Sequence, residues 1–219
     1  PLALAASFDP ETARRAARVA AVEASVSGLH WTFAPMIDIA RDARWGRVVE
    51  GAGEDPYLGA RMAEAQVLGF QTDDLSNQDA MMACAKHFGA YGAGVGGRDY
   101  DRADISSETL HEVYLPPFQA AIAAGAGSFM TAFNELNGTP TTGNAELVRA
   151  LLREEWGYQG LVVSDWNAIL ELVAHGAAST PVEAAALALR AGVDMDMTSN
   201  TYADHLESAI AADPALIPL

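Results

Sequence analysis

An aspartate and a tryptophan stand directly after a short apolar run, in the sequence LVVSDW at 161–166. Two of the three apolar residues are β-branched, which is typical of a short buried strand. The carboxylate of Asp165 could attack an electrophilic carbon or stabilise a cationic centre, and the ring of Trp166 could stack on the apolar face of a sugar. Asp165 could equally cap the helix expected to begin near Ala168. The residues at the other strand ends decide between these roles.

The single lysine of the chain, Lys86, precedes His87 at the end of a second apolar run, and the other twelve basic residues are arginines. Lysine, histidine and arginine side chains can each donate to hydroxyl groups. Together with Asp165 they favour a neutral glycoside over an anion, because the carboxylate would repel phosphate. Other chemically useful side chains at or beyond predicted strand ends are Asp38, Arg44, Arg47, Met130, Phe133, Asp194 and Asp196.

Predicted helices and strands alternate along the chain. Helix starts are indicated by capping residues, several followed by proline, at Asp9-Pro10, Asp55-Pro56, Ser106-Ser107, Asn144 and Thr180-Pro181. Apolar runs predict strands over 31–39, 81–88, 128–133, 161–165 and 193–197. Pro35 should make the first strand irregular, and Pro116-Pro117 should kink the third helix. Strands separated by helices indicate βαβ units and a parallel sheet.

The later strands recur about every 30–35 residues, close to the repeat of a (β/α)₈ barrel of about 250 residues. Eight strands cannot be found in 219 residues. We therefore expect an α/β fold in which residues 1–219 form a single, incomplete (β/α)₈ TIM-type barrel domain whose N-terminal strands precede Pro1. A doubly wound open sheet is the alternative. In a barrel, the carboxyl ends of the strands carry the active site, so the residues named above would converge there.

Composition excludes several other classes of function. A net charge of −16 argues against a nucleic-acid partner, because phosphate contacts need clustered basic residues. No apolar run reaches the length of a membrane span, and Cys84 alone cannot form an intrachain disulfide. The glycines at 92–97 do not follow the dinucleotide-binding spacing and predict a flexible loop over the site. Asp194 and Asp196 lack a third ligand at suitable spacing, so we expect no metal and no cofactor.

Four segments carry a resemblance to a known family: APMIDIARDARWGRVVEGAGEDPYLG, AKHFGAYG, FMTAFNELNGTP and LREEWGYQGLVVSDW. In this order, over most of the chain from about Leu2 to Met197, they resemble the N-terminal barrel domain of glycoside hydrolase family 3. The likeness is to its bacterial periplasmic-type β-glucosidases and β-xylosidases, and it implies that the chain is a fragment. It further implies a retaining, exo-acting β-glycosidase that releases terminal β-D-glucosyl residues through a covalent glycosyl-aspartate.

The resemblance also implies roles for individual residues. Asp165 matches the catalytic nucleophile, and Trp166 matches the stacking tryptophan beside it. Phe133 stands where many relatives have a tyrosine near the nucleophile, so the hydroxyl is absent here. The remaining matches are to substrate-binding residues, namely Arg47, Lys86, His87 and Met130.

The general acid/base of β-glucosidase relatives is a glutamate in a C-terminal domain that is missing here, so the isolated chain should hydrolyse substrates poorly. The β-N-acetylglucosaminidase subgroup uses a histidine in a KHFPGHG-type stretch, whereas this chain reads KHFGAYG and has no histidine between His87 and His111. The expected partner is an oligosaccharide or β-glucoside, with no nucleic acid and no membrane. Many relatives are periplasmic or secreted. Alternatives are a β-xylosidase, a glycoside phosphorylase or a non-catalytic carbohydrate-binding fragment.

Overall fold

A three-stranded parallel sheet lies at the centre of the protein, whose computed structural model describes residues 2–217. Its strands are β1 (Cys84–Phe88), β2 (Ser128–Thr131) and β5 (Leu161–Val163), in the order β1-β2-β5. Nearly all of their residues are buried, as expected for parallel strands that are covered on both faces. The parallel strands and intervening helices confirm the predicted α/β class.

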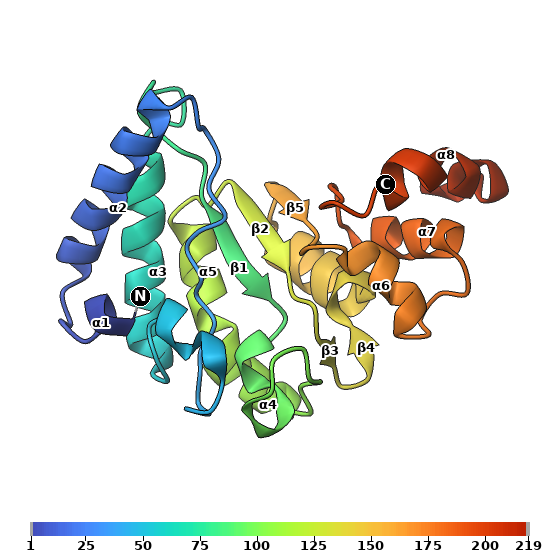
Figure 1. Cartoon of the computed structure of the whole chain (residues 1–219), viewed down its shortest axis with the longest axis horizontal. Helices are drawn as coiled ribbons and strands as arrows, with labels where there is room; N and C mark the ends of the chain where they lie inside the picture. The colour runs from blue at the N-terminus through green and yellow to red at the C-terminus, as the bar shows by residue number, and fades with distance from the viewer. Residues whose placement is uncertain (1, 218–219) are drawn as a thin grey trace.

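Helices flank both ends of this sheet (Figure 1). On the side of β1 they are α1 (Leu2–Ala5), α2 (Pro10–Val26), α3 (Pro56–Gln71) and α5 (Pro116–Ala123). On the side of β5 they are α6 (Ala168–Ala174), α7 (Pro181–Ala191) and α8 (Thr201–Ala212). None of the helices in residues 2–217 has the length and apolar character needed to cross a membrane.

The predicted helix starts are confirmed. Asp9, Asp55 and Thr180 each accept a hydrogen bond from a backbone N–H in the first turn of α2, α3 and α7. The predicted kink is also present. A short helix α4 (Ser107–Thr109) continues as a π-helical segment (Leu110–Tyr114), and α5 begins at Pro116, whose ring nitrogen carries no proton. A second π-helical segment spans Glu146–Glu155.

The first and last predicted strands are extended segments that hydrogen-bond to the sheet but form isolated bridges and not continuous strands, which corrects the prediction of five strands. Residues 31–39 pair at Trp31 with Met82 and at Met36 with Lys86. Pro35 between them has no N–H to donate, so a regular ladder cannot form. In residues 193–197, the carboxylate of Asp194 accepts the Val162 N–H, which displaces a regular backbone partner.

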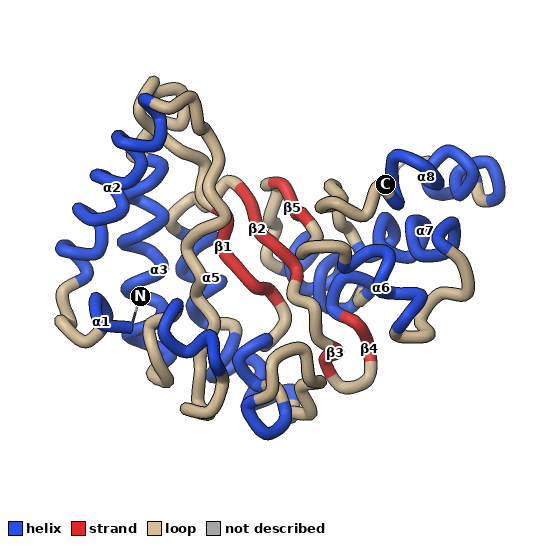
Figure 2. The backbone as a smooth tube through the Cα atoms, in the orientation of Figure 1, coloured by secondary structure: helices blue, strands red, loops and turns tan. Residues whose placement is uncertain are grey.

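A hairpin and a long loop lie beyond the carboxyl ends of the strands (Figure 2). The hairpin joins β3 (Glu135–Leu136) to β4 (Thr139–Pro140) through Asn137-Gly138, both with positive φ (51° and 84°). These two residues are typical of a type I′ turn. The glycine-rich loop after β1 returns to this hairpin, where Ala103 bridges Leu136. The loop and the hairpin therefore lie together beyond the carboxyl ends of the strands.

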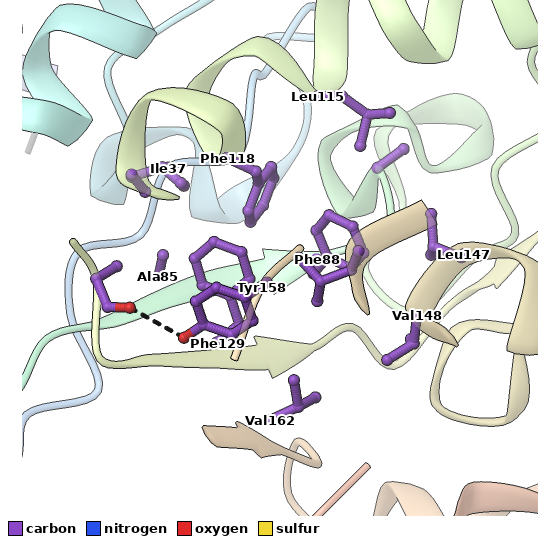
Figure 3. Close-up of a cluster of buried hydrophobic side chains, with 14 of the residues drawn as sticks. Ile37, Ala85, Phe88, Leu115, Phe118, Phe129, Leu147, Val148, Tyr158 and Val162 are labelled. Atoms are coloured by element: carbon purple, nitrogen blue, oxygen red, sulfur yellow. Dashed lines mark hydrogen bonds between the residues drawn. The ribbon is translucent and has the colours of Figure 1, made fainter. Parts of the chain in front are cut away.

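The two faces of the sheet have different cores. On the outer face, Phe88, Phe118, Phe129 and Tyr158 pack between the strands and the helices (Figure 3). On the inner face, each strand contributes one side chain to a small cluster of Cys84, Met130 and Val163. Trp31 lies against this cluster and its ring N–H donates to the Ser128 hydroxyl at 2.8 Å. The inner cluster is the floor below the strand ends.

Candidate functional site

Asp165 follows β5 and precedes α6, and its carboxylate is buried. Oδ1 accepts the Trp166 N–H at 2.6 Å, whereas Oδ2 is buried and has no hydrogen-bond partner within residues 2–217. The cap position of α6 is occupied by Asn167, and the Asp165 side chain makes no capping hydrogen bond to the helix. The capping alternative therefore does not explain this carboxylate. Buried polar atoms without partners are rare and indicate a functional role.

The imidazole of His87 lies between two carboxylates. Asp38 Oδ2 accepts both the His87 backbone N–H at 2.9 Å and the ring Nδ1–H at 2.8 Å. The other ring nitrogen, Nε2, is 3.5 Å from Asp165 Oδ2. Asp38 and His87 are both almost fully buried, so the imidazole is held in one orientation. Asp38 comes from the irregular segment 31–39. Because this segment runs beside β1, the Asp38 carboxylate reaches His87.

Lys86 and His87 influence the same site although they are neighbours on one strand. Strict alternation would place consecutive side chains on opposite faces. The register of β1 on β2 shifts between Ala85 and Phe88, which breaks that alternation. Cys84 belongs to the inner cluster, so Lys86, two residues later, lies above the floor on the inner side. Phe88 returns to the outer core.

The charges around Asp165 oppose the effect of its burial. Burial raises the pKa of this carboxyl. The positive charge of His87, the Trp166 N–H, Lys86 and Arg47 act in the other direction, in that order. Cationic side chains from two segments, β1 and the 3₁₀ turn at 46–50, therefore favour the ionised form of this carboxyl. The same cations could donate to the hydroxyls of a bound sugar.

Arg47 lies on a 3₁₀ turn (Gly46–Glu50) beyond the segment that carries Asp38. Its Nε and Nη2 donate to the two carboxylate oxygens of Glu50 at 2.6 and 3.0 Å. Its guanidinium lies over the ring of Tyr91, 5.5 Å from the centroid. Arg44, by contrast, pairs with Asp42 and is largely exposed. Of Arg44 and Arg47, only Arg47 is among the groups that act on the pKa of Asp165.

Aromatic side chains surround these charged groups. The Trp166 ring is 62% exposed and free to stack on a ligand. Phe133 is buried and stacks on the half-exposed Tyr100, with ring centroids 4.3 Å apart. Met130 lies in the inner cluster, where it supports the floor of the site. The structure therefore places every predicted site residue at or just below the carboxyl ends of the strands.

The remaining candidates have structural partners. Asp194 binds Arg153 and the Val162 N–H, and Asp196 accepts from Ser199 and from the Tyr202 N–H. No cluster of three metal-ligating side chains occurs in the described part of the chain. A separate cavity of about 390 Å³ is lined by residues that include Leu110, His111, Leu136, Asn144 and Leu147, none of which belongs to this site.

Sequence reasoning missed three contributors. The sequence places Asp38 at a strand end without indicating a role, gives no signal for Glu50, and has Tyr91 just before the glycines at 92–97. Gly92 shows that the start of the predicted flexible loop is closely packed. A Cβ there would lie 2.1 Å from the Ile39 carbonyl oxygen, so glycine permits close packing rather than motion. Only the apolar residues around Asp38 and Tyr91 hinted at their burial.

Comparisons with known proteins agree with this arrangement. Residues 1–214 match the family described as Glycosyl hydrolase family 3 N terminal domain. The chain is 46% identical over 209 residues to a periplasmic beta-glucosidase of Salmonella typhimurium, covering 95% of this chain and 27% of that protein. It is 38% identical over 228 residues to a beta-xylosidase of Formosa agariphila, covering 99% of this chain and 32% of that protein.

The structure superposes on the crystal structure of beta-glucosidase from Listeria innocua with a TM-score of 0.95 and 44% sequence identity. The match covers 99% of this chain and 31% of the Listeria protein. The same Listeria enzyme has been crystallised in complex with glucose. The chain thus spans about a third of the length of these relatives, which confirms that it is a fragment, and its partial barrel agrees with their fold. The strand-end site and these matches together show that the chain belongs to the N-terminal domain family of glycosyl hydrolase family 3.

Proposed function

We propose that this chain is the nucleophile-bearing barrel portion of a retaining β-glycosidase that removes terminal, non-reducing β-D-glucosyl residues. The observation that carries the proposal is Asp165 Oδ2, a buried carboxylate oxygen without a hydrogen bond that faces His87 Nε2. A purely structural carboxylate would be paired, as Asp194 is. The relatives named as beta-glucosidase and beta-xylosidase support the reaction class.

In the proposed reaction, the sugar lies above the inner cluster with its hydroxyls toward His87, Lys86 and Arg47. Asp165 Oδ2 attacks the anomeric carbon, and the bond to the leaving-group oxygen breaks with that oxygen taking the electron pair. A second carboxyl, expected from a C-terminal domain outside this chain, protonates the leaving oxygen. The same carboxyl then activates water, which displaces Asp165 and retains the anomeric configuration. Trp166 covers one face of the site.

The electrostatics of Asp165 suit this cycle. Attack requires the ionised carboxylate, and burial alone would favour the neutral acid. The positive charges of His87, Lys86 and Arg47 offset part of that effect. When the ester to the sugar forms, the negative charge disappears and the cations are free to bind sugar hydroxyls more strongly. The proposal therefore assigns the three cations a role in both steps.

The test is covalent trapping with a 2-deoxy-2-fluoro-β-glucoside that carries a dinitrophenyl leaving group, which needs little acid assistance. Asp165 lies in the tryptic peptide 154–190, the sequence between two arginine cleavage sites. We expect a fluorosugar on Asp165 in this peptide, absent in Asp165→Asn and present in the control Asp194→Asn. Labelling elsewhere, or none in the protein expressed from its complete gene, would overturn the proposal.

A β-xylosidase is the second candidate, because a relative of 38% identity bears that name. Their substrates differ in that glucose carries a hydroxymethyl group that xylose lacks. Parallel trapping with the fluoroglucoside and the corresponding fluoroxyloside decides between them, since the reactive sugar labels faster. We also propose an extracytoplasmic location, supported by the name of the periplasmic Salmonella relative. Fractionation of the native host would test it.

A further inference from the structure

Tyr91 occupies the middle of the site without a role in the proposed reaction. It opens a short turn (Tyr91–Ala93) directly after β1, following two residues of positive φ, Gly89 (134°) and Ala90 (59°). The turn packs on the carbonyl of Ile39, the residue after Asp38, because Gly92 carries no side chain. Tyr91 is 2% exposed. The backbone therefore fixes this ring against the segment that supplies Asp38.

The ring contacts two of the three cationic side chains that the proposed reaction uses. Its plane is steeply inclined to that of His87, in an edge-to-face contact with centroids 5.0 Å apart and an angle of 73°. The Arg47 guanidinium lies over the ring at 5.5 Å. These two side chains come from separate segments, and their atoms share no recorded hydrogen bond within residues 2–217. The ring is the element that joins them.

Further aromatic contacts hold the ring itself. Trp45 meets it edge-on, with centroids 5.2 Å apart, and Phe133 lies 6.1 Å away in a tilted arrangement. The Trp45 ring N–H donates to Asp99 Oδ1 at 2.9 Å, which ties the glycine-rich loop to the same cluster. Burial, and then the Asp99 carboxylate, raise the pKa of the Tyr91 phenol, so the hydroxyl stays protonated. That hydroxyl is buried and lies near the Asp99 carboxylate and the Arg47 guanidinium, which both act on its pKa, but it makes no hydrogen bond of good geometry within residues 2–217.

We propose that Tyr91 is a positioning residue of the glycone site, whose ring orients the His87 imidazole and the Arg47 guanidinium toward the sugar. The inference rests on the proposed function. Because the edge-to-face contact with His87 and the cation–π contact with Arg47 both belong to the ring, phenylalanine should replace Tyr91 and an aliphatic residue should not. The role is expressed in substrate binding and in the geometry of attack, not in the overall fold.

The experiment measures kcat and KM for dinitrophenyl β-glucoside with the protein expressed from its complete gene. Tyr91→Leu should raise KM and lower kcat/KM by about tenfold to a hundredfold, the scale of a misplaced catalytic site. Tyr91→Phe should stay within about threefold of wild type, a loss below the tenfold that corresponds to one 1.36 kcal/mol step. Tyr158→Leu is the matched control, since Tyr158 is a buried, ring-stacked tyrosine of the outer core. It should lower Tm and leave KM unchanged.

Wild-type KM and kcat in folded Tyr91→Leu would overturn the inference, as would equal kinetic losses in Tyr91→Leu and Tyr158→Leu. If Tyr91→Leu does not fold by circular dichroism, Tyr91→Met fills similar space without an aromatic ring and carries the same expectation. Wild-type protein that turns over neither the glucoside nor the xyloside would instead refute the proposed function, and the inference with it. If trapping labels Asp165 but the Tyr91 variants keep wild-type kinetics, the proposed function stands and only the positioning role of Tyr91 is refuted.

Discussion

The outer face of the central sheet and the carboxyl ends of its strands differ in how their buried polar groups are hydrogen-bonded. On the outer face, Tyr158 stacks on Phe129 with centroids 4.6 Å apart, and its hydroxyl donates to the Ala126 carbonyl at 3.0 Å (Figure 3). At the carboxyl ends of the same strands, polar atoms are buried and unpaired. Within residues 2–217, the unpaired buried side-chain atoms are Asp38 Oδ1, Tyr91 Oη, Asn134 Oδ1 and Asp165 Oδ2, together with Arg18 Nη1 on α2.

An unpaired buried polar group destabilises a fold by about 1–3 kcal/mol. The outer face avoids that cost at Tyr158, whose hydroxyl is paired, and most of its other side chains are apolar. At the strand ends, four side-chain atoms lack a partner within residues 2–217. A polyhydroxylated ligand could supply the missing partners, since each sugar hydroxyl both donates and accepts. The pairing on the outer face therefore favours stability, whereas the unpaired groups at the strand ends favour binding of a polar ligand.

Asp165→Asn should give the largest effect, with a loss of turnover on the order of 10³-fold or more. It should also stabilise the fold. Burial raises the pKa of Asp165 above its ordinary value of 3.8, so the folded state binds this proton more tightly than the unfolded chain does. The free energy of unfolding therefore falls as pH rises from the unfolded-state value through the folded-state value, and ionised Asp165 is destabilising at neutral pH.

Asparagine removes that charge, so the variant should gain about 0.5–2 kcal/mol at pH 7, with the difference vanishing in acid. Urea unfolding at neutral and acidic pH measures both. Asp194→Asn is the control, because Asp194 is paired with Arg153 and should lose stability when neutralised. An Asp165→Asn protein less stable than wild type at pH 7 would mean that the carboxylate stabilises the fold. The strand ends would then not differ from the outer face in this respect.

Asp38→Asn should lower kcat/KM by about a hundredfold, the scale expected when a substrate-binding group is misplaced. The amide oxygen can still accept from His87 but carries no charge, so the imidazole loses the anion that fixes its orientation. Steady-state kinetics with dinitrophenyl β-glucoside measures the loss. Asp42→Asn serves as control, since Asp42 pairs with the exposed Arg44. Equal kinetics in the two variants would show that the Asp38–His87 pair is a stability feature.

The parts of this molecule that sequence could predict are governed by local rules. Asp9, Asp55 and Thr180 mark helix starts because a capping side chain needs only the next three residues. The LVVSDW stretch placed Asp165 at a strand end for the same reason. The prediction of parallel strands followed from their spacing.

What sequence could not predict depends on contacts between distant segments. Two of the predicted strands lack a regular ladder because Pro35 has no N–H to donate and the Asp194 carboxylate takes the Val162 N–H. Lys86 and His87 share the site only because the register of β1 shifts against β2. Tyr91 looked like a loop residue, since its four ring contacts come from segments up to 46 residues away along the chain. Neither a register shift nor a remote aromatic cluster has a local signature.

Tyr158→Phe tests the outer face. Removing the hydroxyl should destabilise the protein by about 1 kcal/mol, because the Ala126 carbonyl loses its donor in a buried setting. Turnover at a temperature well below Tm should not change, since the ring still stacks on Phe129. Thermal unfolding and steady-state kinetics on the same sample give both values. A change in KM would show that packing in the outer core affects substrate binding at the strand ends.

Glu50→Gln should give the smallest effect, a rise in KM of about two- to fivefold, which corresponds to the scale of a surface ion pair. Glu50 binds two nitrogens of Arg47 and so restrains the guanidinium over Tyr91. The Glu50 side chain is 41% exposed, so added salt should screen the pair and shrink the difference from wild type. The hydrogen bond from Arg47 lowers the pKa of Glu50, so the carboxylate stays ionised at a pH below the usual range of a glutamate, and the restraint is lost only in stronger acid. Glu64→Gln, which breaks the similar pair with Arg61 on α3, should leave KM unchanged. If both variants shift KM alike, the effect is one of net charge, and Arg47 needs no partner to hold it in the site.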